Sequence, residues 1–231
     1  MSRKVFTAGE VLAASDVNSF LMDQTVMSFA GTAARTTAIP TPTLGMYTHL
    51  EDAAPAPRLQ FWNGSAWRSP LGSTLVASSS FSAVTSVAFN NIFTSEFDNY
   101  EIFISASANV ASAVSMFLRA GGSNLTTTTY DFNFIRVENT TLLGNNSSAG
   151  IAWGPFTVRG VTTPNFCKVT LSNPAVSGRS KSILAHTQDR SSVNVTDIGS
   201  GRNTTTTVFD GFAFTATADM TGTCYVYGMR K

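Results

Sequence analysis

The sequence predicts a mainly β protein, with a small N-terminal domain followed by a two-sheet β-sandwich. From Phe81 onward, short runs rich in β-branched and aromatic residues alternate with turns rich in Gly, Asn, Ser and Pro. Within Tyr100–Ile104 and Cys224–Val226, every second residue belongs to one apolar set, which is typical of strands. Stretches with helical periodicity are scarce in this part of the chain. These observations together favour strands as its main element.

The expected strands are separated by turn-forming residues at intervals that suit a sandwich of roughly eight strands. In chain order they are Phe81–Phe89, Tyr100–Ser107, Ser115–Ala120, Tyr130–Glu138, Gly150–Val158, Phe166–Asn173, Ser182–Thr187, Thr207–Thr217 and Thr223–Arg230.

The first part of the chain shows a helical pattern. Thr7–Glu10 has the spacing of a capping box, and Ser15 with Asp16 can cap a second helix from Val17 to about Gln24. The apolar stripe of this segment is too short to form a core alone, so we expect it to pack on other strands or on another chain. Its candidate assembly contacts are Val11, Leu12, Val17, Phe20 and Leu21.

A small β unit is expected after this helical segment. Thr32–Gly45 contains two prolines and is predicted to be extended. Gly45–Leu50 and Arg58–Trp62 are predicted strands, and Asn63-Gly64 is a tight turn because both residue types tolerate positive φ. Ser65–Trp67 would complete a hairpin.

The expected domain boundary follows this hairpin. Residues 1–70 form the predicted attachment domain, with a short helix, a proline-rich extended segment and a hairpin. Residues 71–80, which include a glycine and several serines, are the predicted linker. Residues 81–231 form the predicted sandwich domain.

The composition limits the partners that the protein can have. Hydrophobic residues make up 43% of the 231 residues, whereas charged residues make up 13%, about half of the ~25% typical of soluble domains. Such a surface must be solvated by Ser, Thr and Asn, or covered by other subunits. Because the net charge is +1 and the sequence has no basic stripe, we expect no nucleic-acid partner.

The sequence also predicts that the chain is neither inserted in a membrane nor exported. It has no apolar run of roughly 18 residues, the length that a transmembrane helix needs. Basic residues near the start are followed by Thr7 and Glu10, where a signal peptide would need an apolar run. We therefore expect synthesis in a cytoplasm, without a signal peptide.

Residues arranged for catalysis are hard to find in the sequence. His49 and His186 are far apart and lack a neighbouring Asp or Cys in a catalytic pattern. Glu96, Asp98 and Asp189 are the clearest candidate carboxylates for glycoside hydrolysis. However, Glu96 and Asp98 are predicted to lie in a turn, and Asp189 in a surface pair with the next residue. Neither a phosphate-binding loop nor a Cys/His metal pattern occurs. We therefore expect no enzyme activity, no catalytic residues, no cofactor and no metal.

The two cysteines leave alternatives open. Cys167 and Cys224 each lie in an apolar run, and sequence spacing cannot decide whether they form a disulfide. Synthesis in a cytoplasm favours two reduced, buried thiols.

Trp153 is a weak candidate for a receptor contact. An exposed tryptophan could stack on a saccharide ring, but large aromatic residues more often pack in a core, and the sequence favours that alternative.

The opening segments combine a predicted helix, a proline segment and an NGSAW hairpin, in that order. The residues concerned are Arg3–Leu12, Ala14–Asn18, Leu21–Gln24, Phe29–Arg35, Ala38–Pro40, Gly45–Tyr47, Leu50–Asp52 and Phe61–Trp67. In these residues and their order, the segment resembles the N-terminus of minor tail proteins from tailed bacteriophages of actinobacteria.

Four segments of the second domain carry a second resemblance: Phe97–Ile102, Ser148–Gly154, Phe209–Phe214 and Thr221–Gly228. In these segments the domain resembles the jelly-roll-type C-terminal modules of phage fibre and minor structural proteins. The resemblance implies a jelly-roll-like sandwich in a virion component, commonly trimeric, whose N-terminal part docks on the particle and whose C-terminal part faces outward. It implies no catalytic residues.

The expected function is therefore that of a minor tail subunit, at the tail tip or in a fibre, which takes part in host adhesion. Its expected partners are copies of itself in a trimer, other phage structural proteins and a glycan of the host cell surface. A head fibre or capsid decoration protein is the first alternative. A carbohydrate-binding module or a depolymerase acting on host envelope glycans is an alternative of another class.

Overall fold

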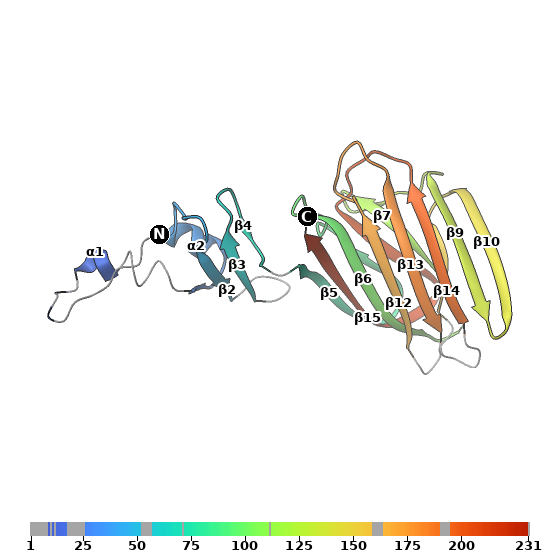
Figure 1. Cartoon of the computed structure of the whole chain (residues 1–231). Helices are drawn as coiled ribbons and strands as arrows, with labels where there is room; N and C mark the ends of the chain where they lie inside the picture. The colour runs from blue at the N-terminus through green and yellow to red at the C-terminus, as the bar shows by residue number, and fades with distance from the viewer. Residues whose placement is uncertain are drawn as a thin grey trace. The chain divides into compact units, whose positions relative to one another are not determined.

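A computed structural model describes residues 9, 11, 13–17, 26–51, 57–70, 72–110, 112–158, 164–189 and 195–230. The chain divides into two compact units, Met1–Gly72 and Ser73–Lys231, called here the N-terminal unit and the large unit. Strands dominate the described residues of the large unit, whereas the N-terminal unit combines a small sheet with short helices (Figure 1). The structure thus confirms the mainly β class.

The N-terminal unit contains a small mixed sheet with the strand order β1-β2-β3-β4. Strand β1 is parallel to β2, whereas the other neighbours are antiparallel. The elements are α1 (Ala14–Val17), β1 (Met27–Phe29), α2 (Thr32–Ala38), β2 (Tyr47–Leu50), β3 (Arg58–Trp62) and β4 (Trp67–Arg68).

The predicted hairpin is confirmed between β3 and β4. The side-chain oxygen of Asn63 accepts hydrogen bonds from the backbone N–H groups of Ser65, at 3.0 Å, and Ala66, at 2.8 Å. Gly64 has a φ of 97°, which favours glycine. The rings of Trp62 and Trp67 then meet edge to face with centroids 5.6 Å apart, so the turn and the aromatic pair support the same register.

Helix α2 corrects the prediction that Thr32–Gly45 is extended. Proline disfavours helix only in the residue before it and in the turn that it would interrupt. The helix ends at Ala38, two positions before Pro40, and its sequence contains three alanines, which favour helix. Arg35 fastens the helix to the sheet, because its side chain is buried, bonds to Gln60 and lies 4.5 Å from the ring centre of Trp67.

The helices predicted around Thr7–Glu10 and over Val17–Gln24 lie mostly outside the described residues. The described part of this segment contains α1, a four-residue helix.

The described residues of the large unit form an 11-stranded sheet. Its main path runs β10-β9-β14-β13-β12-β6-β15-β7-β11, while β5 pairs with β15 and β8 pairs with β7. The strands are β5 (Ser73–Phe89), β6 (Phe97–Ala108), β7 (Ser112–Ala120), β8 (Ser123–Asn124), β9 (Tyr130–Glu138), β10 (Thr141–Gly150), β11 (Trp153–Val158), β12 (Asn165–Ser172), β13 (Lys181–Asp189), β14 (Val195–Asn203) and β15 (Gly211–Arg230).

Strand β15 lets this sheet curl upon itself. Its first part, Gly211–Ala216, pairs with β7, and its later part, from Met220 onward, pairs with β6. Strand β5 accompanies both parts, with register shifts between them. Strand β11 then contacts β6, β9 and β13 across the interior. The curled sheet therefore encloses one core, and all neighbouring strands in it are antiparallel (Figure 1).

Aromatic side chains fill the core with their polar atoms satisfied. The rings of Tyr130 and Trp153 meet edge to face at 5.1 Å. The Tyr130 hydroxyl donates to the Leu125 carbonyl at 3.2 Å and accepts from the Leu118 N–H at 3.0 Å. The Trp153 Nε1–H donates to the Arg202 carbonyl at 3.2 Å. Large apolar rings are thus buried without leaving these polar groups unpaired.

Every strand predicted in the large unit overlaps an observed strand, and Tyr130–Glu138 has the observed bounds of β9. Three strands, β8, β10 and β14, were not predicted. Strand β8 has only two residues, and β10 and β14 are rich in Gly, Asn and Ser, which are typical of turns. The two strands predicted after Thr207 are parts of the single strand β15. The predicted linker 71–80 is corrected, because Ser73–Ser80 belongs to β5 and pairs with β15.

Candidate interaction surface

The two faces of the large sheet differ in what covers them. On β6, the residues Tyr100, Ile102 and Ile104 point into the core and are 0%, 0% and 8% exposed. The residues between them point to the opposite face, called here the outer face. Because strand register aligns equivalent positions, side chains of neighbouring strands form rows across this face.

One such row, called here the outer row, crosses six strands. Successive pairs in the register are Tyr225 with Phe103, Phe103 with Lys168, Lys168 with His186, His186 with Ile198, and Ile198 with Ile135. Tyr225, Ile198 and Ile135 are 43%, 55% and 56% exposed. The row therefore places apolar side chains in solvent along the width of the sheet.

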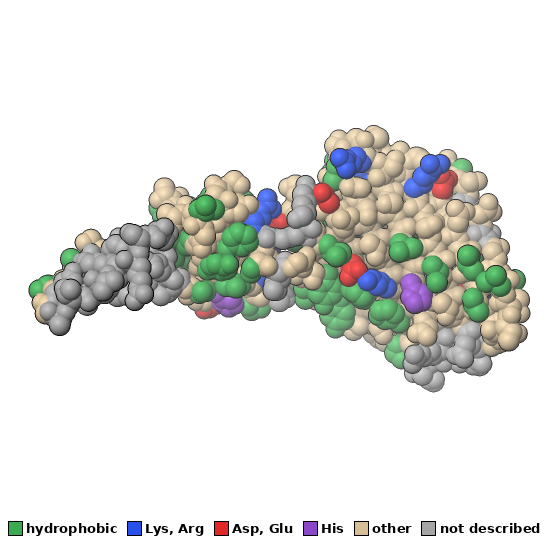
Figure 2. Space-filling view, in the orientation of Figure 1, with side chains coloured by type: hydrophobic (Ala, Val, Ile, Leu, Met, Phe, Trp, Pro, Cys, Tyr) green, Lys and Arg blue, Asp and Glu red, His purple; other side chains and the backbone are tan. Residues whose placement is uncertain are grey.

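Further exposed apolar side chains lie beside this row. Phe166, Leu184, Val137 and Leu142 belong to β12, β13, β9 and β10. Figure 2 shows hydrophobic side chains spread over the large unit among uncharged polar ones, with few charged groups. By register these side chains form two groups, an aromatic one on β15, β6 and β12 and an aliphatic one on β13, β14, β9 and β10, with Lys168 and His186 between them. Grouped exposed apolar residues are typical of an interaction site, whereas scattered single residues are ordinary.

An open hollow lies at the β15 end of the outer face. It has a volume of about 460 Å³ and is called here the aromatic hollow. The Phe103 ring is central in it, with its centroid 6.0 Å from that of Phe166 and 5.8 Å from that of Tyr227. The lining residues are Ser73, Glu101, Phe103, Phe166, Tyr225 and Tyr227.

A charged pair adjoins these rings. Lys168 Nζ lies 2.5 Å from the Glu101 carboxylate and 5.4 Å from the centre of the Phe103 ring. The Lys168 and Glu101 side chains are 39% and 24% exposed. Because solvent screens such a pair, it contributes about 0–1 kcal/mol to stability. Its donors and acceptors remain accessible to a ligand.

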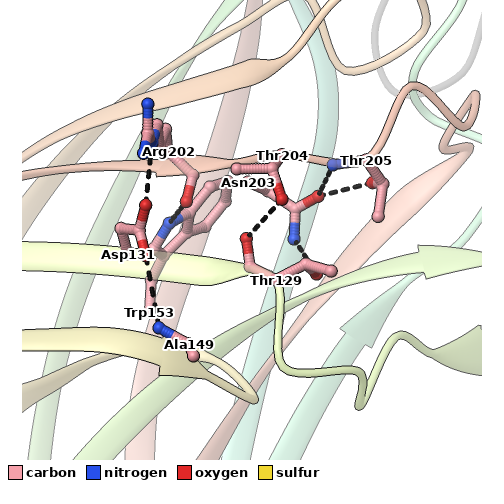
Figure 3. A network of polar contacts seen from close by, with 8 residues as sticks. All are labelled: Thr129, Asp131, Ala149, Trp153, Arg202, Asn203, Thr204 and Thr205. Carbon is pink, nitrogen blue, oxygen red and sulfur yellow. Dashed lines mark hydrogen bonds and ion pairs between the residues drawn. The ribbon is translucent and has the colours of Figure 1, made fainter.

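The other end of the outer face carries a polar hollow of about 590 Å³. It is lined by Asp131, Asn133, Asn146, Ser148, Ser182, Ile183, Ser200, Gly201 and Arg202. Arg202 Nε lies 2.7 Å from Asp131 Oδ2, and the Ala149 N–H donates to Asp131 Oδ1 at 3.2 Å (Figure 3). The Arg202 hydrogen bond, followed by that from Ala149, holds the pKa of Asp131 below its ordinary value of 3.8. The two hollows thus differ in chemistry, one being mostly aromatic and the other polar.

Figure 3 also shows hydrogen bonds that connect β9 and β14 at this end of the sheet. The Asn203 amide donates to the Thr129 hydroxyl at 3.0 Å and accepts from the Thr205 N–H at 3.1 Å. The Thr204 N–H donates to the Thr129 carbonyl at 3.0 Å. These bonds join the start of β9 to the end of β14, so the polar residues here have structural partners.

The cysteines lie on the inner face and cannot approach each other closely. Cys224 and Cys167 are both register partners of Ile104, one from each side of β6. Two strand spacings separate them by about 9.6 Å, more than the ~7 Å that a disulfide can span between Cα atoms. Burial raises the pKa of Cys224 to about 12 and also raises the pKa of Cys167. The geometry therefore favours two thiols.

The structure places Trp153 in the core, where it is 0% exposed. Its ring packs on Tyr130, so it is not available to stack on a ligand, and the core alternative describes it. Val11 is 87% exposed. Of the other candidate assembly contacts, Leu12, Phe20 and Leu21 lie outside the described residues, and only the backbone of Val17 is described, within α1.

Among the residues that the structure describes, the contacts of His49 differ from those of a catalytic triad. The Ser28 hydroxyl lies 3.2 Å from His49 Nδ1 and donates to the Glu51 carboxylate at 2.8 Å. In a nucleophilic triad the carboxylate orients the imidazole, whereas here it binds the serine. His186 is exposed on the outer row.

The described residues contain neither a cluster of metal-ligating side chains nor a membrane-spanning helix. No group of three or more His, Cys, Asp or Glu side chains there could hold a metal ion. No helix in that part of the chain is long and apolar enough to cross a membrane.

Sequence reasoning missed the outer face as a site. The available signal was the presence of apolar or aromatic residues on both faces of one strand, with Tyr225 and Tyr227 on one face and Cys224 and Val226 on the other. A strand with one solvated face usually has polar residues there.

Comparison of the chain with protein-family models, with curated proteins and with solved structures found no match.

Proposed function

We propose that the protein is a structural subunit of a bacteriophage particle, located at the tail tip or in a fibre, where it takes part in adhesion to the host. The observation that carries this proposal is the outer face, where a well-packed antiparallel unit exposes aromatic side chains on one side of Lys168 and His186 and aliphatic side chains on the other. An apolar surface of this kind favours a protein that acts by binding. The resemblance of the N-terminal segments to minor tail proteins is the reason for placing the protein in a bacteriophage particle.

We further propose that the large unit is a jelly-roll-like sandwich. Strands β5 and β15 run through both halves of the curled sheet, as strands do at the corners of orthogonally packed sheets. Strand β11, at one end of the path, packs back on strands of the other half. This arrangement supports two facing layers joined by shared strands.

The proposed assembly is a trimer docked through its N-terminal segment. Val11 is exposed in that segment, and Leu142 and Leu143 are exposed on β10, the last strand of the path. Such side chains are favourable contacts between copies, and a low-charge surface can pack against itself with a small desolvation cost. The particle is the proposed location, and neighbouring phage structural proteins are the proposed partners.

The test is to locate the subunit in particles of the phage that encodes it. An epitope tag after Lys231 should be labelled by gold-conjugated antibody at the tail tip or along a fibre in electron micrographs. Label on the head would favour a head fibre or decoration protein instead. Particles that contain no tagged chain would contradict the proposal.

Docking is tested by Phe20→Asp and Leu21→Asp. We expect both variants to yield soluble, folded protein, as judged by circular dichroism, but to be lost from purified particles. Val208→Asp is the matched control, because Val208 is 48% exposed in the large unit. Normal incorporation of the two N-terminal variants would show that this segment does not dock the subunit.

A further inference from the structure

We propose that the aromatic hollow is a saccharide-binding site, in which a pyranose or furanose ring lies on exposed aromatic side chains and its hydroxyls bind the Glu101–Lys168 pair. This inference rests on the proposed role in adhesion and names the class of ligand. It also assigns a site, which is distinct from Trp153.

The stacking surface comes from three neighbouring strands. Tyr225 and Tyr227 on β15 are separated by one residue and so lie on the same face. Phe103 on β6 pairs with Tyr225 in the register, and Phe166 on β12 is its diagonal neighbour. Tyr225 and Phe166 are each 43% exposed. The rings are therefore held by strands yet open to solvent.

Aromatic rings of this kind suit the apolar side of a sugar. The C–H groups on one face of a sugar ring are apolar, and they pack on the negative face of an aromatic ring. Tyrosine adds a hydroxyl at the rim that can bond to a ligand while its ring makes the apolar contact. Rigid strands keep these rings in place before binding, which lowers the entropic cost of binding.

The charged pair suits the polar side of the same ligand. Glu101 can accept hydrogen bonds and Lys168 can donate them, and each side chain remains partly exposed while they pair. Neighbouring hydroxyls of a sugar both donate and accept, so one can face the carboxylate and the next the ammonium group. Ser73 adds a hydroxyl to the lining.

The same features favour a sugar over a second copy of the chain in this hollow. Covering the Glu101–Lys168 pair with an apolar protein surface would remove it from water at a large cost. A sugar brings hydroxyls that replace the lost water. The volume of about 460 Å³ lies within the range of about 300–1,000 Å³ for small-ligand sites. Apolar walls with a few placed polar groups are also typical of such sites.

The experiment measures binding of the full chain to an array of immobilised bacterial surface polysaccharides, followed by titration with soluble oligosaccharides of the best binder. We expect Tyr225→Ala and Phe166→Ala to weaken binding about tenfold or more, as anchor residues do. Tyr225→Phe should retain most of the affinity, because it keeps the ring. Glu101→Gln and Lys168→Met should also weaken binding, since each removes one charge.

Matched controls lie outside the outer row. Ile151→Ala and Val208→Ala change residues that are 52% and 48% exposed, and they should leave the affinity unchanged. Loss of binding in these controls equal to that in Tyr225→Ala would overturn the assignment. So would the absence of binding to any polysaccharide of the array, or a change in oligomeric state caused by Tyr225→Ala without loss of saccharide binding.

The result of the saccharide-binding test can be distinguished from the result of the test for incorporation into particles. A subunit found in particles whose hollow binds no saccharide would overturn this inference alone. Saccharide binding by a chain that is absent from particles would support the inference and overturn the particle role.

Discussion

Phe212 and Phe166 belong to the same large sheet but have opposite surroundings. Phe212, on β15, is 0% exposed and stacks on Phe89 with centroids 5.0 Å apart. Phe166, on β12, is 43% exposed, and its ring contact is with Phe103 at 6.0 Å. A buried ring gains stability from the area that it removes from water, whereas an exposed ring gains little. The exposed rings of the outer face therefore need another explanation, and we assign them to binding.

The ion pairs of the large unit show the same contrast. Asp197 binds Arg136 through two bonds of 2.7 and 2.9 Å, and their side chains are 7% and 15% exposed. Asp131 binds Arg202 at 2.7 Å, but these side chains are 28% and 66% exposed. Removing one partner of a buried ion pair lowers the stability of the fold strongly. Removing one partner of an exposed ion pair lowers it little, because water solvates the remaining charge.

The largest expected difference concerns the two phenylalanines. Phe212→Ala should lower the free energy of unfolding by about 3–5 kcal/mol, because it leaves a cavity in the core. Phe166→Ala should lower it by only about 1 kcal/mol, since 43% of the residue is already exposed to water. Urea unfolding followed by circular dichroism measures both values. Equal losses in the two variants would contradict the division into a stabilising inner face and a binding outer face.

A smaller effect is expected for the carboxylates. Asp197→Ala should cost about 2–3 kcal/mol, because it removes two charge-assisted hydrogen bonds between mostly buried side chains. Asp131→Ala should leave the unfolding midpoint close to that of the unchanged protein. The same urea experiment provides the measurement. A larger loss for Asp131→Ala than for Asp197→Ala would show that burial does not govern these pairs.

The inner face should also protect its thiols. Burial raises the pKa of Cys224 to about 12, so the reactive thiolate is scarce at pH 8. Ellman's reagent should therefore label Cys224 slowly in the folded protein and rapidly in urea. A Cys167→Ser variant isolates the Cys224 signal. Rapid labelling of that folded variant would mean that the core around Cys224 is open.

The smallest expected effect concerns the pKa of Asp131. Its pKa is lowered from 3.8 mainly by the Arg202 hydrogen bond, so the bond's contribution is present above the ordinary pKa. That contribution is lost as the pH falls through the lowered value. Carboxyl chemical shifts measured by NMR should give a pKa below 3.8, and Arg202→Ala should raise it toward that value. An unchanged pKa in Arg202→Ala would assign the shift to another group.

Much of the fold was predictable because its signals are local. The alternation within β6 and the bounds of β9 follow from residues next to one another in the sequence, as does the Asn63-Gly64 turn. Strand β14 was not predictable, because its glycines are required by distant rings. A Cβ at Gly199 would lie 2.5 Å from the Phe132 ring, which nothing near Gly199 in the sequence reveals.

The candidate site was less predictable than the fold. Sequence alternation shows that Phe103 and Phe166 face one side of their own strands, but not that the two strands are neighbours. The register of β12 with β6 joins residues about 60 positions apart, and that of β15 with β6 joins residues still more distant. Long-range pairing of this kind depends on the whole fold. The sequence therefore offered Trp153 as a weak candidate while favouring a core position for it, and the structure places it in the core.

Covalent footprinting of intact particles tests the central claim most directly, before and after addition of the polysaccharide that the chain binds on the array. We predict that Tyr225 and Phe166 are labelled in particles and become protected by the polysaccharide, while Phe212 remains unlabelled throughout. Protection of Tyr225 and Phe166 in particles without polysaccharide would contradict the account, because it would show that a neighbouring subunit covers the outer face.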